Sequence, residues 1–125
     1  MTKSILIVDD EEDIRALIQL GLEMQVGWKV LNSNSGEEAI QIAATEQPDV
    51  ILLDLMMPDM DGKTTLQKLK HNPKTQKIPV ILMTAKSKSS VGESFANLDI
   101  AAIFTKPLRP LNLAQQISEV LLAAS

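Results

Sequence analysis

The stretch Val50-Ile51-Leu52-Leu53-Asp54 decides the fold, because four apolar residues run without interruption into a single acid. A strand with one solvent-exposed face alternates apolar and polar residues. A short continuous apolar run is instead typical of a strand buried on both faces. Ile5 to Val8, Val80 to Met83 and Ile100 to Phe104 have the same character, and the more mixed run Trp28 to Leu31 suits an edge strand. We therefore expect a parallel sheet covered by helices on both faces.

The intervals between these runs carry helical signals. Ser35 and Glu38 form an S-x-x-E capping pattern, Asp61 can cap the next helix, and Pro110 suits the first turn of the last one. The interval from Lys86 to Asn97 is rich in serine and contains a glycine, so we expect only a short helix there. Strand and helix thus alternate five times, which predicts a doubly wound (βα)5 sandwich of the α/β class with strand order 2-1-3-4-5.

Length and composition limit the classes of function that the protein can have. The 125 residues fit one domain, residues 1–125, and the charge of −4 with only three aromatic residues disfavours nucleic acid and anionic membranes as direct partners. The absence of cysteine excludes disulfides, thiol catalysis and cysteine metal sites. Neither a membrane span nor a signal peptide is recognisable, so we expect a cytoplasmic location.

Polar residues follow the predicted strands where the chain leaves the sheet. Asp9 and Asp10 end the first run, Asp54 ends the third strand and Thr84 the fourth, and Lys106-Pro107 follows the fifth. In open parallel sheets the carboxyl edge of the strands binds ligands. With strands one and three as neighbours, Asp9, Asp10 and Asp54 would converge there.

Three carboxylates in one pocket repel each other unless a cation lies between them. Ligand sets made only of oxygen favour a hard ion, so we expect Mg²⁺, with Mn²⁺ as the alternative. A metal ion, an ammonium such as Lys106 and a hydroxyl such as Thr84 are what phosphoryl transfer needs, and a carboxylate can act as the nucleophile and form an acyl phosphate.

Four motifs lie at these strand ends: Ile7 to Glu11, Asp54 to Gly62, Thr84-Ala85 and Lys106-Pro107. Together they resemble the response-regulator receiver domains of two-component signalling, and the likeness covers nearly the whole chain. The resemblance implies a flavodoxin-like fold and a phosphorylation-dependent switch, in which Asp54 accepts a phosphoryl group from a sensor histidine kinase or a histidine phosphotransfer protein. Such a domain is not an enzyme beyond its own aspartate phosphorylation and dephosphorylation.

The resemblance also implies roles for the other motif residues. The metal ligands would be Asp10, Asp54 and the backbone carbonyl of Met56, with Asp9 acting through water. The phosphoryl group would be bound by Thr84, Lys106 and the backbone of Ala85, and Lys106-Pro107 would be a cis peptide.

One departure from the family pattern concerns how the signal is read out. Receivers usually place an aromatic residue or histidine three residues before the lysine, where Ile103 stands here. Phe104 lies one residue later and should face the other way by strand alternation. The expected switch pair is therefore Thr84 with an atypical Ile103. By resemblance, a downstream protein would bind the face made by Lys86 to Asn97, the fifth strand and the last helix, and homodimerisation is left open.

Three alternatives compete with the phosphorylated switch. An aspartate-nucleophile phosphatase normally needs a second acid two residues after the nucleophile, where this chain has Met56. A nucleotide-binding module of similar fold needs a loop rich in glycine, serine or threonine after the first strand, where this chain has acids. A receiver that signals through constitutive protein contacts would leave crowded carboxylates unused.

Within 125 residues that contain no output segment, a stand-alone regulator is favoured over a piece of a larger protein.

Overall fold

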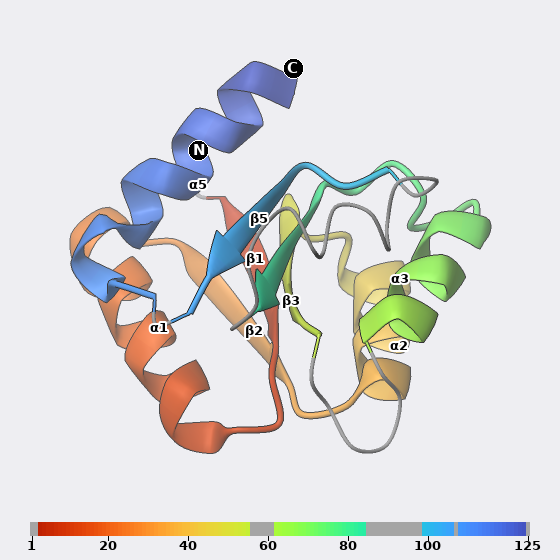
Figure 1. Ribbon diagram of the computed structural model, residues 1–125, viewed down its shortest axis with the longest axis horizontal. Coiled ribbons are helices and arrows are strands. Elements are labelled where there is room, and N and C mark those ends of the chain that lie inside the picture. The colour runs from red at the N-terminus through yellow and green to blue at the C-terminus, as the bar shows by residue number, and fades with distance from the viewer. Residues whose placement is uncertain (1–2, 56–61, 85–98, 107, 125) are drawn as a thin grey trace.

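A computed structural model of the chain describes residues 3–55, 62–84, 99–106 and 108–124. The strands in these ranges are β1 (Ser4–Val8), β2 (Lys29–Ser33), β3 (Val50–Asp54), β4 (Val80–Thr84) and β5 (Ala102–Thr105). The helices are α1 (Glu12–Val26), α2 (Gly36–Glu46), α3 (Gly62–His71) and α5 (Pro110–Ala124) (Figure 1). No helix in the described ranges is long and apolar enough to span a membrane.

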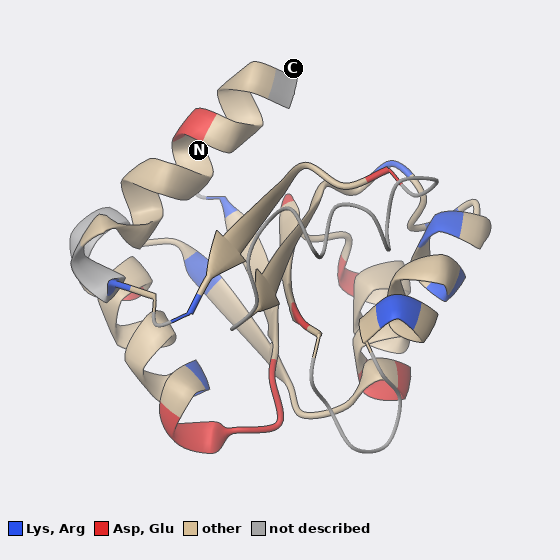
Figure 2. Ribbon diagram, viewed as in Figure 1, with Lys and Arg blue, Asp and Glu red and all other residues tan. Residues whose placement is uncertain are grey.

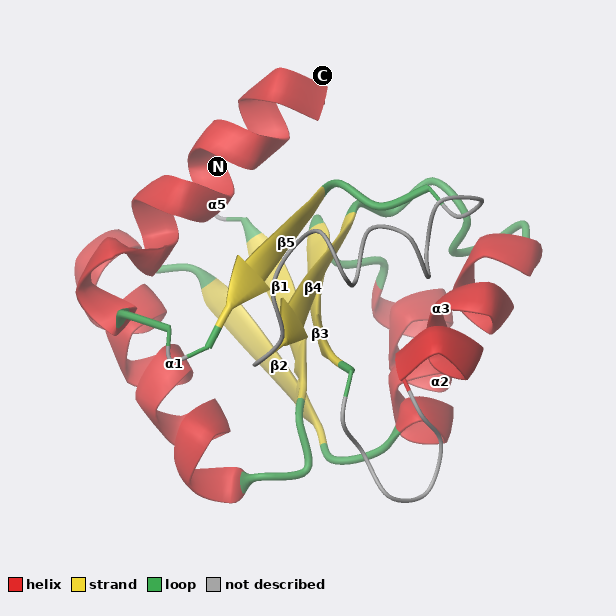
Figure 3. Cartoon of the chain, viewed as in Figure 1, coloured by secondary structure: helices red, strands yellow, loops and turns green. Residues whose placement is uncertain are grey.

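The five strands form one parallel sheet in the order β2-β1-β3-β4-β5, as predicted. Helices α1 and α5 cover one face, and α2 and α3 cover the other (Figure 3). Residues of α2 and α3 pack with Leu6, Val8, Ile51 and Leu53, whereas α1 and α5 pack with the alternate residues of the same strands. The central strand β3 is therefore buried on both faces, which explains its uninterrupted apolar run.

Two strands begin later in the chain than the sequence predicts. β2 begins at Lys29 rather than Trp28, because Gly27 ends α1 in the left-handed region at φ 65° and Trp28 is buried in the core beside Leu22. β5 begins at Ala102 rather than Ile100, although the amide of Ala101 already donates to the carbonyl oxygen of Val80 at 2.8 Å.

The predicted helix starts are confirmed where the structure describes them. α5 begins at Pro110. At α2 the hydroxyl of Ser35 accepts a hydrogen bond from the amide of Glu38 at 3.2 Å, but the amide of Ser35 donates to the hydroxyl of Ser33, so only half of the capping box forms. Asp61 and the segment from Lys86 to Asn97 lie outside the described residues.

Candidate functional site

Two buried aspartates lie side by side at the carboxyl edge of the sheet. β1 pairs with β3 in a register that sets Val8 opposite Leu53, so Asp9 and Asp54 follow on neighbouring strands. Both residues are almost fully buried, at 0% and 1% exposure. Buried carboxylates need charged or hydrogen-bonding partners, which makes this pair the centre of the candidate site.

Asp10 completes a cluster of three carboxylates. Its side chain is exposed, and one carboxylate oxygen from each of Asp9, Asp10 and Asp54 lies within 4.8 Å of the others. Figure 2 shows acidic residues gathered along the turn that joins β1 to α1, and basic residues along α3. The predicted convergence of the three carboxylates is therefore present in the structure.

Lys106 provides the positive charge at this cluster. Its Nζ lies 3.3 Å from Oδ1 of Asp54 and 3.4 Å from Oδ2 of Asp9. Burial by itself would lower the pKa of Lys106, but the charges of Asp54 and Asp9 and its hydrogen bonds to both outweigh burial, so the pKa is raised. The ammonium therefore stays charged at neutral pH.

The backbone holds Lys106 at this edge. It follows β5 directly, and its amide donates to the carbonyl oxygen of Thr84 at 2.7 Å. Thr84 is the last residue of β4 and is 2% exposed. The two residues expected to bind a phosphoryl group thus lie at the same edge as Asp54, on the strands that continue the sheet beyond β3.

The turn that carries Asp9 and Asp10 is fixed by hydrogen bonds. The amide of Asp9 donates to the carbonyl oxygen of Ser33 at 3.1 Å, and Oδ1 of Asp9 accepts from the amide of Glu11 at 2.9 Å. The guanidinium of Arg15 donates to the carbonyl oxygen of Asp9. The sequence pattern did not single out Arg15, because the local sequence of a helix does not indicate which backbone carbonyl an arginine side chain will contact in the folded protein.

Gly62 is a second residue that the motifs did not explain. Its amide donates to the carbonyl oxygen of Leu55 at 3.3 Å, and Leu55 follows Asp54 directly. A methyl group on Gly62 would lie 2.6 Å from the Cα of Leu55 and 2.9 Å from the carbonyl oxygen of Asp54. Only glycine lets α3 begin this close to the end of β3, so Gly62 helps to set the backbone beside Asp54.

We expect Gly62→Ala to lower the free energy of unfolding by about 1–3 kcal/mol, because the backbone atoms it would contact have little room to yield. Urea denaturation measures the effect. Gly27→Asn is the matched control, since nothing lies within 4 Å of a Cβ there and asparagine tolerates the positive φ. If Gly62→Ala is as stable as the wild type, the backbone of Asp54 and Leu55 can move to accommodate the added methyl group at little cost.

The readout residues of β5 point to opposite faces of the sheet, as predicted. Ile103 packs against the cluster under α2 and α3, whereas Phe104 packs against the cluster under α1 and α5. Phe104 therefore does not take the aromatic position. Met56, Ala85 and Pro107, and with Pro107 the expected cis peptide, lie outside the described residues.

In the described part of the chain, the candidate metal ligands are the carboxylate oxygens of Asp9, Asp10 and Asp54. The described cluster offers three carboxylates against one lysine, so its own charges do not balance. A small hard cation fits both the donor set and the excess negative charge.

The chain matches the family model of the response regulator receiver domain over residues 5–118. It is 37% identical over 125 residues to the alkaline phosphatase synthesis transcriptional regulatory protein PhoP of Bacillus subtilis, in an alignment that covers 97% of this chain and 49% of that protein. The chain thus spans about half the length of the curated relatives it matches.

Among the solved structures that resemble the chain are two receiver proteins. One is the N-terminal domain of a response regulator receiver protein from Methanoculleus marisnigri, at 34% identity and a TM-score of 0.78, covering 97% of this chain and 98% of that one. The other is the chemotaxis protein CheY4 of Vibrio cholerae, at 23% identity and a TM-score of 0.87, covering 96% and 99%, which supports the fold alone. Since the family match runs through all five strands and includes every carboxylate of the cluster, the chain belongs to the response regulator receiver domain family.

Proposed function

We propose that this domain is a signalling switch that Asp54 turns on by accepting a phosphoryl group from the phosphohistidine of a sensor kinase or a histidine phosphotransfer protein. The observation that carries the proposal is the buried carboxylate of Asp54, held 3.3 Å from the Lys106 ammonium beside two further carboxylates. Receiver domains are signalling modules of two-component systems, and aspartate phosphorylation is typical of the family.

The transfer needs few groups from this chain. A carboxylate oxygen of Asp54 attacks phosphorus, the bond from phosphorus to the donor's imidazole nitrogen breaks, and the electron pair of that bond leaves with the imidazole. Lys106 keeps its charge and offsets the negative charge of the phosphoryl oxygens. The Thr84 hydroxyl and the Ala85 amide are the proposed hydrogen-bond donors to those oxygens. The chain acts only on its own aspartate, in phosphorylation and in dephosphorylation.

We assign the metal position to Mg²⁺, with Mn²⁺ as the alternative. Asp10 and Asp54 would bind it directly, with the Met56 carbonyl as a further ligand and Asp9 through water. When bound, the ion offsets the charge of the carboxylates and of the phosphoryl oxygens. The donor set supports this assignment, because all three described carboxylates offer only oxygen.

Mg²⁺ should stabilise the folded protein, and Asp10→Ala should remove that effect. A ligand at one hundred times its Kd stabilises the folded state by about 2.7 kcal/mol, so the thermal midpoint of the wild type should rise with Mg²⁺. Asp13→Ala is the matched control, because Asp13 is also exposed but lies outside the cluster. If Asp10→Ala keeps the wild-type rise, Asp10 is not a ligand.

The phosphorylated state would be read out through Thr84 and Ile103 on the neighbouring strands β4 and β5. We propose that a downstream protein binds the face formed by the segment Lys86 to Asn97, β5 and α5, with homodimerisation through that face left to measurement. We also propose that residues 1–125 form a single receiver domain that works in the cytoplasm.

The surface of α1 is the proposed docking site for the phosphodonor. This helix begins two residues after Asp10 and exposes three large apolar side chains at helical spacing: Leu17, Leu20 and Met24, with 54%, 54% and 76% exposure. Exposed apolar side chains grouped in this way mark interaction surfaces. A donor that covers this stripe would bring its histidine to the edge that holds Asp54.

Intact mass after incubation with acetyl phosphate tests the proposed function. We expect the wild type to gain one phosphoryl group with Mg²⁺ and none when the metal is chelated. An unchanged mass in both cases, with no binding of the phosphate mimic beryllofluoride, would favour a receiver that signals through constitutive contacts. Steady turnover of a phosphomonoester would favour a phosphatase instead.

A further inference from the structure

Arg15 is a cation that binds a backbone carbonyl although it lies next to a run of acids. Residues 9–13 are all aspartate or glutamate, and Arg15 follows two residues later in the first turns of α1. Within the described ranges, however, Arg15 forms no ion pair. Its guanidinium donates instead to the carbonyl oxygen of Asp9, and its side chain is half-buried. Arg15 therefore contacts the backbone of the acidic turn rather than its charges.

The carbonyl that Arg15 binds belongs to the peptide unit that joins Asp9 to Asp10. A peptide unit is planar, so a bond to its oxygen also fixes the direction in which the backbone enters Asp10. The next peptide unit is held as well, because the amide of Glu11 donates to Oδ1 of Asp9 at 2.9 Å. The side chain of Asp10 itself is exposed and makes no hydrogen bond or ion pair in the described part of the chain. The position of the Asp10 carboxylate thus depends on these two backbone bonds, and only the bond from Arg15 comes from outside the turn.

Helix α1 is fixed in the rotation that this contact needs. Gln19 follows Arg15 by four residues, so the two lie on one face of the helix. Oε1 of Gln19 accepts from Nδ2 of Asn32 in β2 at 2.8 Å, and Nε2 of Gln19 donates to Oε2 of Glu23 at 3.2 Å. This face of α1 is therefore attached to the sheet, and the Arg15 side chain reaches the turn from a helix that is already ordered.

We propose that Arg15 is a positioning residue for the metal site, because its bond to the peptide between Asp9 and Asp10 directs the Asp10 carboxylate toward the divalent cation. Groups that orient metal ligands without touching the metal commonly change its affinity by about 10–100-fold when they are removed. The charge of Arg15 alone would act in the opposite direction, since a guanidinium near the site repels a cation. Positioning and charge thus predict opposite signs for the effect of removing Arg15.

This inference rests on the proposed function, because it concerns the metal site assigned there. Its readout is Mg²⁺ binding, which does not require phosphoryl transfer, so the two proposals can fail separately. Weaker Mg²⁺ binding in Arg15→Met, together with a wild type that takes up no phosphoryl group, would sustain the role of Arg15 and reject the phosphorylated switch.

The test is a Mg²⁺ titration of wild type and variants, followed by the NMR amide signals of Asp10 and Glu11. Arg15→Met keeps an unbranched side chain without a donor, and its Kd for Mg²⁺ should rise about tenfold. Arg15→Lys keeps a donor, and since the contact is a single bond to one carbonyl, its Kd should stay within about threefold of the wild type. Lys29→Met is the matched control, because it removes an exposed cation beside the start of β1, at the other end of the sheet, and its effect should stay below about twofold.

Two further measurements separate positioning from damage to the fold. In the metal-free protein, the amide of Glu11 should exchange faster in Arg15→Met, whereas the amide of Leu52 in the buried strand β3 should keep its wild-type protection. The rate of phosphorylation by acetyl phosphate should fall in Arg15→Met at low Mg²⁺ and recover when Mg²⁺ saturates the site, because the ligands are still present. Unchanged or tighter Mg²⁺ binding in Arg15→Met, equal losses in Arg15→Met and Arg15→Lys, or a wild type that binds no Mg²⁺ would each overturn the proposal.

Discussion

Asp54→Asn is expected to gain no phosphoryl group from acetyl phosphate and Mg²⁺, under conditions in which the wild type gains one. The amide of asparagine has nearly the shape of the carboxylate but is not a nucleophile toward phosphorus. The substitution also leaves the ion pair of Lys106 with Asp9 in place, so the fold and the position of the lysine should persist. Intact mass spectrometry measures the loss directly.

The neighbouring acids provide the controls for this result. Asp9→Asn keeps the Asp54 carboxylate, and we expect it to be phosphorylated more slowly because the metal site has lost one charge. Asp13→Asn changes an exposed acid outside the cluster and should match the wild type. A full phosphoryl adduct on Asp54→Asn would mean that another side chain accepts the group, and proteolysis followed by mass spectrometry would locate it.

The sheet could be predicted because its interior strands are buried on both faces. Val50 to Leu53 and Val80 to Met83 have uninterrupted apolar sequences for that reason, and the strand order then brings Asp9 and Asp54 together. Lys106 lies 97 residues from Asp9 in the sequence. Its position could still be predicted, because it follows the last strand and the carboxyl ends of parallel strands meet at one edge of the sheet. The central chemistry thus follows from the order of elements.

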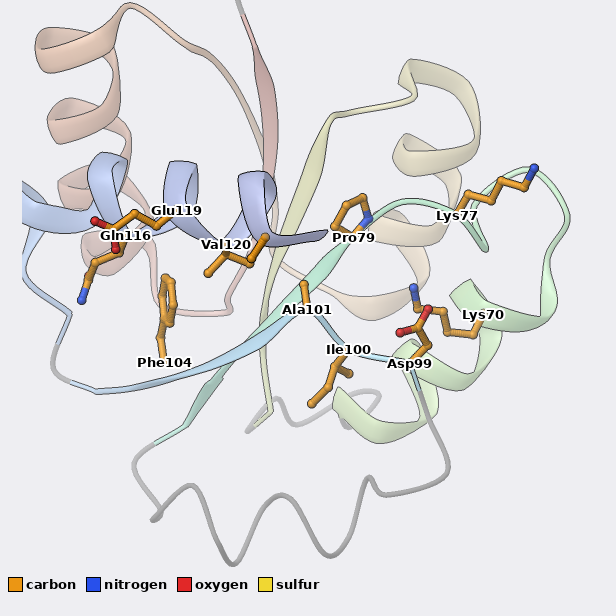
Figure 4. Close-up of a pocket in the computed structure, with 11 residues that line it drawn as sticks. Lys70, Lys77, Pro79, Asp99, Ile100, Ala101, Phe104, Gln116, Glu119 and Val120 are labelled. Atoms are coloured by element: carbon orange, nitrogen blue, oxygen red, sulfur yellow. The ribbon is translucent and has the colours of Figure 1, made fainter. Parts of the chain in front are cut away.

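Other features depend on contacts that no local pattern encodes. The bond from Arg15 to the carbonyl oxygen of Asp9, and the approach of Gly62 to Leu55, arise only when helices and strands are packed. Trp28 illustrates the limit at strand ends, since a β-forming aromatic residue turns into the core once Gly27 has ended α1. The pocket lined by Lys70 of α3, Phe104 of β5 and Val120 of α5 likewise forms only when these elements and the loops before β4 and β5 come together in the folded chain (Figure 4).

Lys106→Met is expected to lower the free energy of unfolding by about 2 kcal/mol in the absence of divalent cations. The substitution keeps the length of the side chain but leaves Asp9 and Asp54 buried beside each other without a cation. Removing one partner of a fully buried ion pair costs roughly 3–5 kcal/mol. The lysine side chain is 19% exposed, so water already screens part of its interaction and the expected loss is smaller.

The dependence on pH and Mg²⁺ identifies the cause of this loss. Because the pKa of Lys106 is raised in the folded state, its stabilising effect is complete below the ordinary value of 10.5 and disappears as the pH rises through the raised value. The stability difference between wild type and Lys106→Met should therefore be large near pH 7 and shrink above pH 10.5.

Mg²⁺ should reduce the loss of stability in Lys106→Met, because a cation bound by the three carboxylates supplies the positive charge that the variant lacks. Lys68→Met replaces an exposed lysine of α3 and should change stability by less than about 0.5 kcal/mol. Urea denaturation of the three proteins, with Mg²⁺ and with chelator at several pH values, makes the comparison. A loss in Lys106→Met that is independent of both pH and Mg²⁺ would mean that Lys106 stabilises the fold by packing, and that the carboxylates are balanced by another group.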